Sequence, residues 1–368
     1  MEQQHNLHKK AHEFGSQNFA TGSLNRPDAL DNFQSLLSVE EMLYDGGRTR
    51  TAVRTAEIGR SLRLEEQRGA RMSVMARVAQ AYCEAVLSGE NLTVAMDLVR
   101  SAEADLRRAA DVRTSGMSTD ADVLAIRVHL AAMREQQIRR SYELHTALGA
   151  LNEAVGMPLA TVVSLSSSLA GPLNDMQAGK GTREQRPEAR EARLSADLSD
   201  LRAASVRAAY RPEAALRFAW EVDAQQVVLK AGANWMASVT LRWNLFNGFA
   251  DRAAVREAAL EQARSRSHER EVNAGIELQV RRASNALKGA RERVVVEEAS
   301  VAMAEENLRI VRNRYESGLT TVTELLRSEV AVAEVRTRRL AAVADVRLAA
   351  VAIDLSEGTL APGSAGLR

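Results

Sequence analysis

The sequence has 368 residues, a formal net charge of +1 and one cysteine, Cys83. The near-neutral charge argues against a protein that binds nucleic acid electrostatically, and a single cysteine excludes an intrachain disulfide. Hydrophobic residues make up 45% of the chain, but aromatic residues only 4%, and there are six prolines. This composition favours long helices over a β-sandwich and is ample for a buried core. We therefore expect a mainly α protein with a small β part.

Two features concern membranes and export. No run of about 18 apolar residues is present, so any crossing of a bilayer has to be made by strands. The first residues, MEQQHNLHKKAHEFG, lack the apolar stretch of a secretory signal. The internal repeat described next offers an explanation for the missing signal.

One unit is written twice, at an offset of 202 residues. The segment LYDGGRTRTAVRTAEI, which starts at Leu43, matches LFNGFADRAAVREAAL, which starts at Leu245. The same offset still pairs Gly156 with Gly358, so more than a hundred residues align without a gap. Two copies are too few for a solenoid, and we expect pseudo-symmetry within a larger ring.

Each copy begins with strand-like segments of period two. In the second copy, apolar side chains alternate with largely polar ones over 235–245 and over 216–222, which together predict a hairpin. The first copy keeps the pattern less cleanly over 33–39, and a weak strand at 14–19 would supply a fourth. A sheet packed on a soluble core gives the same alternation, so the pattern alone leaves a membrane barrel open.

A very long helix follows each strand region. After Gly46 and Gly248, few breakers interrupt the chain until Gly116 and Gly318, which predicts helices of nearly seventy residues, about 100 Å at 1.5 Å per residue. A sustained heptad of apolar residues indicates left-handed coiled-coil packing. Its positions are Val78, Ala85, Leu92, Val99 and Leu106 in the first copy, and Val280, Leu287, Val294, Val301, Leu308 and Tyr315 in the second.

The chain has to reverse at two tips, because glycine adopts the positive φ of a helix C-cap. Ser118 or Thr119, and Thr320 or Thr321, are candidate N-caps of returning helices of about forty residues. The tip residues are Ser115, Gly116 and Met117 in the first copy, and Ser317, Gly318 and Leu319 in the second.

A further helix opens at Pro187 and leads into the second strand pair, so we expect it to cover the half of the long helix that the returning helix leaves bare. Its first-copy equivalent would begin before Met1. We therefore expect that the chain is truncated or its start misassigned, and that the missing stretch carried this helix and a signal peptide. By repeats, the chain divides into a first repeat (1–156), a loop-rich connection (157–186), a second repeat (187–358) and a tail (359–368).

The strands constrain the assembly. Four strands cannot close a barrel, and open sheet edges are untenable in lipid. Two chains would give eight strands with a filled interior, whereas three give twelve strands and a lumen. The smallest channel is thus a homotrimer, in which a 12-stranded β-barrel continues into an α-barrel of long antiparallel helical hairpins.

The segments LYDGGRTR, SGMSTDADVL, ALNEAVGMPL, LFNGFADR and YESGLTTVTELL, in this order and spacing, resemble the TolC-like outer-membrane efflux proteins. The resemblance covers the chain from about Phe33 onward. It implies a passive exit duct of a tripartite efflux or type I secretion system, with a barrel in the lipid of the cell outer membrane and a periplasmic tunnel. It also implies tips that contact a periplasmic adaptor (membrane fusion) protein and an inner-membrane pump, with no cofactor and no catalytic residue.

The resemblance further implies a gate or constriction at Asp122, Tyr315 and Glu324. Two positions depart from the family pattern: Thr320 stands where a basic partner is expected, and Arg327 where a second acidic pore residue is expected. The same residues would also suit a purely structural role. Tyr315 continues the heptad and fits the core, and the helix dipole favours carboxylates in a first turn in any case.

The remaining predicted features are the strand-to-helix turns at Gly46, Gly47 and Gly248, and membrane-girdle aromatics at Trp220, Trp235 and Trp243. The competing hypotheses are a soluble structural coiled-coil protein, which gives no reason for aromatics to bracket a strand, and a periplasmic adaptor, which needs one hairpin between β-domains. We expect no metal site, because His5, His8 and His12 have helical spacing but no acidic or cysteine companion.

Overall fold

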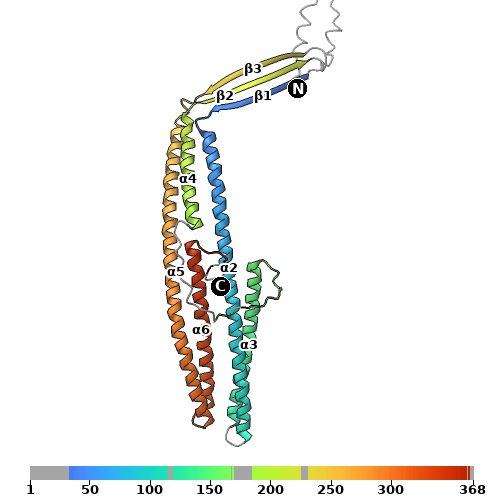
Figure 1. Cartoon of the computed structure of the whole chain (residues 1–368), viewed down its shortest axis with the longest axis vertical. Coiled ribbons are helices and arrows are strands. Elements are labelled where there is room, and N and C mark those ends of the chain that lie inside the picture. Colours follow the sequence, from blue (N-terminus) through green and yellow to red (C-terminus); the bar gives the residue numbers. More distant parts are fainter. Residues whose placement is uncertain are drawn as a thin grey trace, which may run out of the picture. The chain divides into compact units, whose positions relative to one another are not determined.

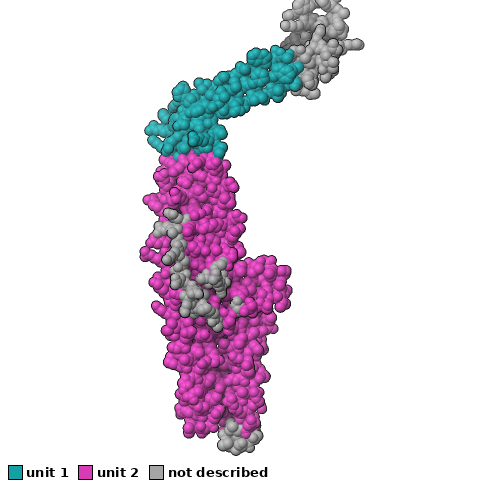
Figure 2. Space-filling model, in the orientation of Figure 1, with its two compact units in different colours: residues 1–53, 202–257 teal, residues 54–201, 258–368 magenta. Residues whose placement is uncertain are grey.

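The computed structural model describes residues 33–114, 119–166, 168–169, 185–224, 231–362 and 364. The chain forms two compact units (Figure 2). Unit 1 comprises residues 1–53 and 202–257, and unit 2 comprises residues 54–201 and 258–368. Each unit contains segments of both repeats. The two units, which are defined by contacts in space, therefore do not coincide with the two repeats, which are defined by the sequence.

Unit 1 contains an antiparallel sheet in the order β1-β2-β3 (Figure 1). The strands are β1 (Phe33–Tyr44), β2 (Glu213–Ala224) and β3 (Ala231–Arg242). The three strands predicted in this region are confirmed, although β3 ends at Arg242 and not at residue 245. The weak strand predicted at 14–19 lies outside the described residues.

The register of the sheet separates its side chains into two faces, because residues directly opposite each other point to the same side. On one face, Trp220 lies opposite Leu37 and Trp235, and Phe218 lies opposite Val39 and Ala237; on the other, Arg217 lies opposite Glu40 and Ser238. The apolar face is open in the single chain, where Trp235 is 71% and Val239 is 68% exposed. The predicted alternation is therefore present as one apolar and one polar face.

Four helices account for most of the chain. The long helices α2 (Arg48–Thr114) and α5 (Ala250–Glu316) have 67 residues each, and the returning helices α3 (Asp120–Val155) and α6 (Val322–Glu357) have 36 each. Adding 202 to the bounds of α2 and α3 gives the bounds of α5 and α6. The predicted repeat is thus a repeat of structure. Among the described residues, no helix is both long and apolar enough to cross a bilayer.

Within unit 2 each long helix pairs with its returning helix. On the first pair, Arg134 Nη2 donates to Glu103 Oε1 over 2.9 Å. On the second pair, the equivalent Arg336 Nη2 donates to Glu305 Oε1 over 2.6 Å. The same bridge at the same offset shows that the two hairpins share one packing register.

Helix starts and ends follow from capping. Of the candidate N-caps, Thr119 and Thr321 have this role, with extended backbones and side chains that accept from the amides of residues 122 and 324. Gly156 and Gly358 end the returning helices with φ of 80° and 74°. At Gly358 a Cβ would also lie 2.9 Å from the Gln185 carbonyl oxygen, so this position requires glycine.

The helix predicted at Pro187 is α4 (Pro187–Arg207). It lies against both long helices, since Asp200 accepts from Gln262 of α5 over 2.9 Å and Arg190 pairs with Glu65 of α2 over 2.9 Å. Its start meets the end of α6, where Arg186 Nη1 donates to the Ser356 carbonyl over 3.0 Å. The prediction that this helix covers the rest of the long helix is therefore confirmed.

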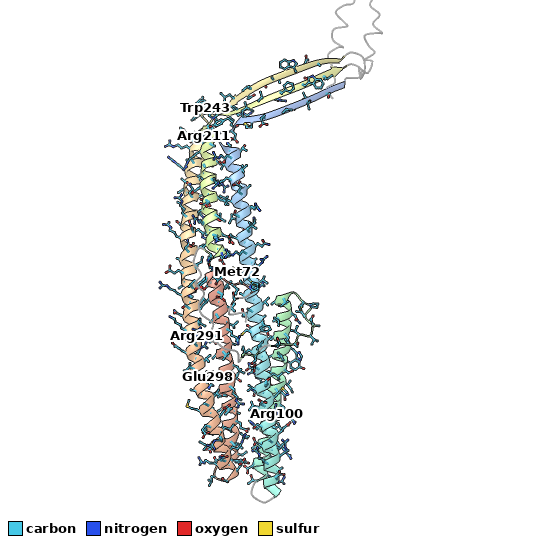
Figure 3. The ribbon with its side chains drawn as sticks, in the orientation of Figure 1. Met72, Arg100, Arg211, Trp243, Arg291 and Glu298 are labelled. Atoms are coloured by element: carbon cyan, nitrogen blue, oxygen red, sulfur yellow. The ribbon has the colours of Figure 1, made fainter. Side chains whose placement is uncertain are left out.

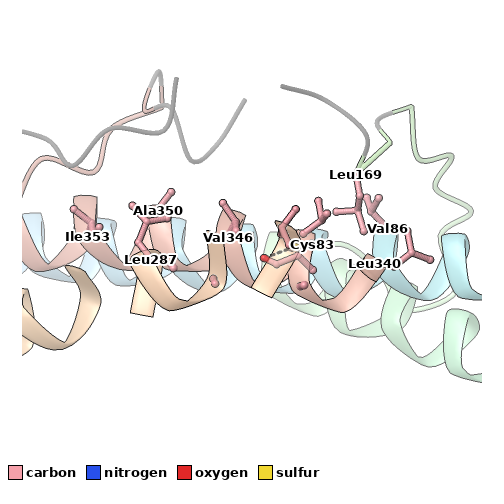
Figure 4. Close-up of a cluster of buried hydrophobic side chains, with 14 of the residues drawn as sticks. Cys83, Val86, Leu169, Leu287, Leu340, Val346, Ala350 and Ile353 are labelled. Atoms are coloured by element: carbon pink, nitrogen blue, oxygen red, sulfur yellow. Dashed lines mark hydrogen bonds between the residues drawn. The ribbon is translucent and has the colours of Figure 1, made fainter. Parts of the chain in front are cut away.

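The largest core cluster lies where α5 and α6 pack with α2 (Figure 4). Leu287 of α5 and Val346 of α6 are 5% and 0% exposed, and small alanines let the backbones approach closely. Cys83 of α2 lies in this cluster, its thiol 3.8 Å from the Ala344 carbonyl (Figure 4), and burial raises its pKa to about 11. All the predicted heptad positions are buried or half-buried.

Replacing Leu287 by Ala should lower the free energy of unfolding by about 2–5 kcal/mol, because the buried side chain leaves a cavity between three helices. Denaturant unfolding of the purified chain in detergent, followed by helical circular dichroism, measures this loss. The matched control is Lys288→Ala at the neighbouring exposed position, which should change the value by less than about 0.5 kcal/mol. Equal losses in the two variants would show that the heptad positions of α5, which include Leu287, do not form the core.

Candidate functional site at the helix ends

The strand-to-helix turns have the same backbone in both copies. Gly46 and Gly47 have φ of 72° and 94°, and their equivalents Gly248 and Phe249 have φ of 67° and 68°. At Gly46 a Cβ would lie 3.1 Å from the Ala208 carbonyl oxygen, so this turn needs glycine. Sequence reasoning missed Phe249, which takes a conformation that costs roughly 1–2 kcal/mol for a residue with a side chain; only its equivalence to Gly47 could have indicated it.

Side chains of unit 1 form hydrogen bonds at and near these turns. Arg211 Nη1 donates to the Gly46 carbonyl over 3.0 Å, and Trp243 Nε1 donates to the Tyr210 carbonyl over 3.1 Å (Figure 3). Trp243 lies one residue beyond the end of β3, whereas Trp220 and Trp235 form a cross-strand pair within the sheet. All three indoles are exposed, by 42% for Trp220, 71% for Trp235 and 57% for Trp243. Their role as membrane-girdle aromatics stays a prediction.

The second tip closes α5 with a double hydrogen bond. The amide of Leu319 donates to the Arg314 carbonyl over 2.8 Å, and the amide of Gly318 donates to the Tyr315 carbonyl over 2.9 Å. Gly318 has a φ of 73°, as the predicted C-cap requires. Ser317 Oγ donates to the Asn313 carbonyl, and the Leu319 side chain is 68% exposed. The first-tip residues Ser115, Gly116 and Met117 lie outside the described residues.

Tyr315 lies at the small core that joins the four helix ends. It is half-buried against a cluster formed by Ala109 of α2, Val123 and Ile126 of α3, and Val322 of α6. Burial raises the pKa of the phenol, and the negative charges of Asp122 and then Asp105 raise it further. Tyr315 is thus both a core residue and a neighbour of Asp122, so a structural role and a gating role are compatible at this position.

Asp122 and Glu324 are held by threonines at the starts of their helices. Asp122 Oδ2 accepts from the Thr119 amide over 3.1 Å and from the Thr119 hydroxyl over 2.8 Å. Glu324 accepts from the Thr320 hydroxyl and is exposed. Both carboxylates therefore have a local capping role, and Thr320 positions Glu324 in place of the basic partner that the resemblance leads one to expect. Arg327 is exposed one turn further along α6.

Sequence reasoning missed a buried polar cluster formed by Asp105, His129, Arg312 and Glu329. A signal was available, because Asp105 lies between the buried Ala102 and Ala109, and Glu329 between Leu325 and Val332. A carboxylate that lies on the apolar face of an amphipathic helix is buried wherever that face packs against another helix.

No group of three or more His, Cys, Asp or Glu side chains that could hold a metal ion occurs in the part of the chain that the structure describes. The three histidines near the start, His5, His8 and His12, lie outside that part.

Two comparisons concern the sequence. A family model described as outer membrane efflux protein matches residues 12–157 and 180–359. Protein CyaE of Bordetella pertussis is 27% identical over 343 residues, which are 90% of this chain and 72% of CyaE.

Solved structures show the same fold. A structure of CusC superposes with a TM-score of 0.79 at 18% identity, covering 89% of this chain and 78% of CusC. The outer membrane protein VceC of Vibrio cholerae gives a TM-score of 0.74 at 15% identity, over 89% of this chain and 87% of VceC. The MtrE outer membrane channel of Neisseria gonorrhoeae, in its open state, gives 0.73 at 18% identity, over 92% of this chain and 80% of MtrE.

Proposed function

The chain belongs to the outer membrane efflux protein family, and from this premise we propose that three copies assemble into one exit duct. The chain is an outer-membrane efflux channel subunit of a tripartite efflux or type I secretion system. The channel is a passive conduit and not an enzyme. The observation that carries this function is the match of the family model to both halves of the chain, each with the same 67- and 36-residue helical hairpin.

Apolar stripes left open on the helices of unit 2 support a ring of copies. On α5, Val296, Met303 and Ile310 recur every seven residues and are 62%, 66% and 45% exposed. On α3, Val128 and Tyr142 are 72% and 69% exposed. Exposed apolar surface of this extent marks an interaction site. We assign the α5 stripe to α3 of the neighbouring copy, so that each chain provides one side of each of two seams.

The sheet of unit 1 supports the same assembly. Its apolar face is open and its described edge strands, β1 and β3, have a neighbour on one side only. With the fourth strand predicted at 14–19, three chains supply twelve strands that close on themselves. The apolar face then meets outer-membrane lipid, and Trp220, Trp235 and Trp243 lie where amphipathic rings suit its boundary.

The helix ends provide the proposed constriction. Tyr315 and Asp122 belong to different hairpins and meet beside the tip core, while Glu324 presents a carboxylate at the start of α6. The tips at 115–117 and 317–319 are the surface for a periplasmic adaptor, with an inner-membrane pump behind it. The exposed side chain of Leu319 supplies an apolar contact for that partner.

The gate is tested by single-channel recording in planar bilayers. The wild-type protein should give discrete conductance steps, and Tyr315→Phe should raise the conductance because it removes the hydroxyl that interacts with the charge of Asp122. Tyr82→Phe, at a half-buried position remote from the tips, is the matched control and should leave the conductance unchanged. Absence of steps from wild-type trimers contradicts the channel, and an unchanged conductance in Tyr315→Phe contradicts the gate.

The tip is tested by export in cells that carry the whole system. Gly318→Leu places a bulky side chain at a position with φ of 73° and should abolish export while trimers still form. Gly59→Leu, at a half-buried position of α2 where an added Cβ has no described atom within 4 Å, should export normally. Export by the Gly318→Leu trimer would refute adaptor docking at this tip.

A further inference from the structure

A cluster of buried charged groups joins the two hairpins of unit 2 a few turns from their ends. Asp105 of α2 and Glu329 of α6 are 3% and 2% exposed. His129 of α3 and Arg312 of α5 lie against Glu329, so all four helices contribute. Carboxylates are almost never this deeply buried without partners. The hydrogen bonds that the two carboxylates make therefore indicate whether they are ionised or share a proton.

One oxygen of each carboxylate accepts hydrogen bonds from neighbouring side chains. Glu329 Oε1 accepts from Ser101 Oγ over 2.8 Å and from Arg312 Nη2 over 2.7 Å. Asp105 Oδ1 accepts from Arg108 Nη1 over 3.1 Å, and this half-exposed guanidinium also lies 3.5 Å from Glu316 of α5. Each carboxylate therefore has one oxygen that accepts a hydrogen bond from a guanidinium.

Among the residues that the structure describes, the other oxygen of each carboxylate has no donor. Within that part of the chain, Asp105 Oδ2 and Glu329 Oε2 are both buried and unpartnered, and His129 Nε2, 3.8 Å from Glu329 Oε2, also has no hydrogen-bond partner. Two ionised carboxylates can only accept, whereas one proton between them turns one of them into a donor. A proton shared by Asp105 and Glu329, whose side chains interact, would give the pair a donor and would remove the repulsion between two buried like charges.

We propose that the Asp105–Glu329 pair is a proton-operated latch between the two hairpins. With the proton present, α2 of the first hairpin is bonded to α6 of the second. When the proton leaves, the two carboxylates repel each other and this contact between the hairpins loosens. The proton passes to solvent, so the step needs no other reactant.

The electrostatics place this exchange near neutral pH. Burial raises the pKa of Asp105 to about 7, helped by the bond to Glu329 and its charge, and opposed by Arg312 and Arg108. Because this pKa lies above the ordinary value of 3.8, the stability due to the proton is fully present below about pH 4 and is lost as pH rises through about 7. Burial lowers the pKa of His129, so its neutral ring leaves the latch proton in place at neutral pH.

Solvent can reach the cluster from two sides. A groove of about 370 Å³ between α2, α5 and α6 is lined by Ser101, Arg312 and Glu329 among others. A second groove of about 630 Å³ between α3 and α6 includes His129 in its lining. A proton can therefore enter or leave without unfolding of the helices.

The latch is linked to the tip core. Asp105 lies one helical turn from Ala109, which packs in the cluster beside Tyr315, and the charge of Asp105 raises the pKa of the Tyr315 phenol. Loss of the proton at Asp105 therefore changes the packing and the electrostatic environment of Tyr315, the residue assigned to the gate. This consequence for the duct rests on the proposed function, whereas the latch itself is a property of the folded chain.

The latch is tested by infrared difference spectroscopy of the purified protein between pH 5 and 9. The wild type should show a protonated carboxylic acid that is lost with a midpoint near pH 7. Asp105→Asn, whose amide supplies a permanent donor to Glu329, should lack this signal. Glu329→Gln removes the partner charge and should move the midpoint to lower pH. The control Asp97→Asn, whose side chain on α2 is 45% exposed, should keep the wild-type curve.

Hairpin separation is measured by spin labels in place of Arg100 of α2 and Glu298 of α5, both exposed (Figure 3), in a Cys83→Ser background. The distance distribution should broaden from pH 6 to pH 8 in the wild type and stay narrow at both values in Asp105→Asn. A wild type without a protonated acid near neutral pH, or equal broadening in Asp105→Asn, would overturn the latch. Neither readout depends on conductance, so failure of the channel assignment would be seen separately.

Discussion

The structure depends on one constraint: a 67-residue helix has no way to bury its own apolar stripe. Each long helix needs a partner along its whole length, and the 36-residue returning helix covers only part of it. In the second copy α4 takes over where α6 ends, and the junction is closed by Arg186 and by the tight approach at Gly358. Apolar side chains of the long helices that these partners do not cover, such as Met303 on α5, are exposed to solvent in the single chain. These exposed stripes are the surfaces that we assign to contacts between copies.

Much of this fold could be predicted because its signals are local. Glycine at helix ends, threonine at helix starts and a heptad within each helix are written in neighbouring residues, and the duplication at an offset of 202 tests each element twice. The end of β3 at Arg242 was harder to predict, because the alternation continues to residue 245 although the pairing with β2 has ended. Phe249 was missed because nothing in its own neighbourhood asks for a positive φ.

The candidate site was only partly predictable, because it depends on which positions face each other across helices from different copies. The resemblance pointed to Asp122, Tyr315 and Glu324, and the structure adds their threonine partners and the core beneath Tyr315. The cluster around Asp105 and Glu329 was not predicted, because the two residues are 224 positions apart. The apolar period of each helix indicates that its carboxyl group is buried, but not which residue on the other helix it meets.

Comparison of the two copies separates scaffold from specialised residues. The Glu103–Arg134 bridge recurs as Glu305–Arg336, so it belongs to the hairpin itself. In contrast, the position equivalent to Asp105 is Asn307, and the position equivalent to Glu329 is Arg127. Only one of the two possible contacts between hairpins therefore carries a carboxyl pair. The duplicated framework supplies the two hairpins, and the carboxyl pair of Asp105 and Glu329 is a feature that the duplication does not repeat.

The central claim is that a single chain is one part of a closed ring. Native mass spectrometry of the protein released from detergent micelles tests this most directly, because it counts the copies. Our account predicts a species of three chains, each of 40.2 kDa, as the main folded form. A folded species that carries one chain alone, with the stripes on α3 and α5 open to solvent, would contradict it.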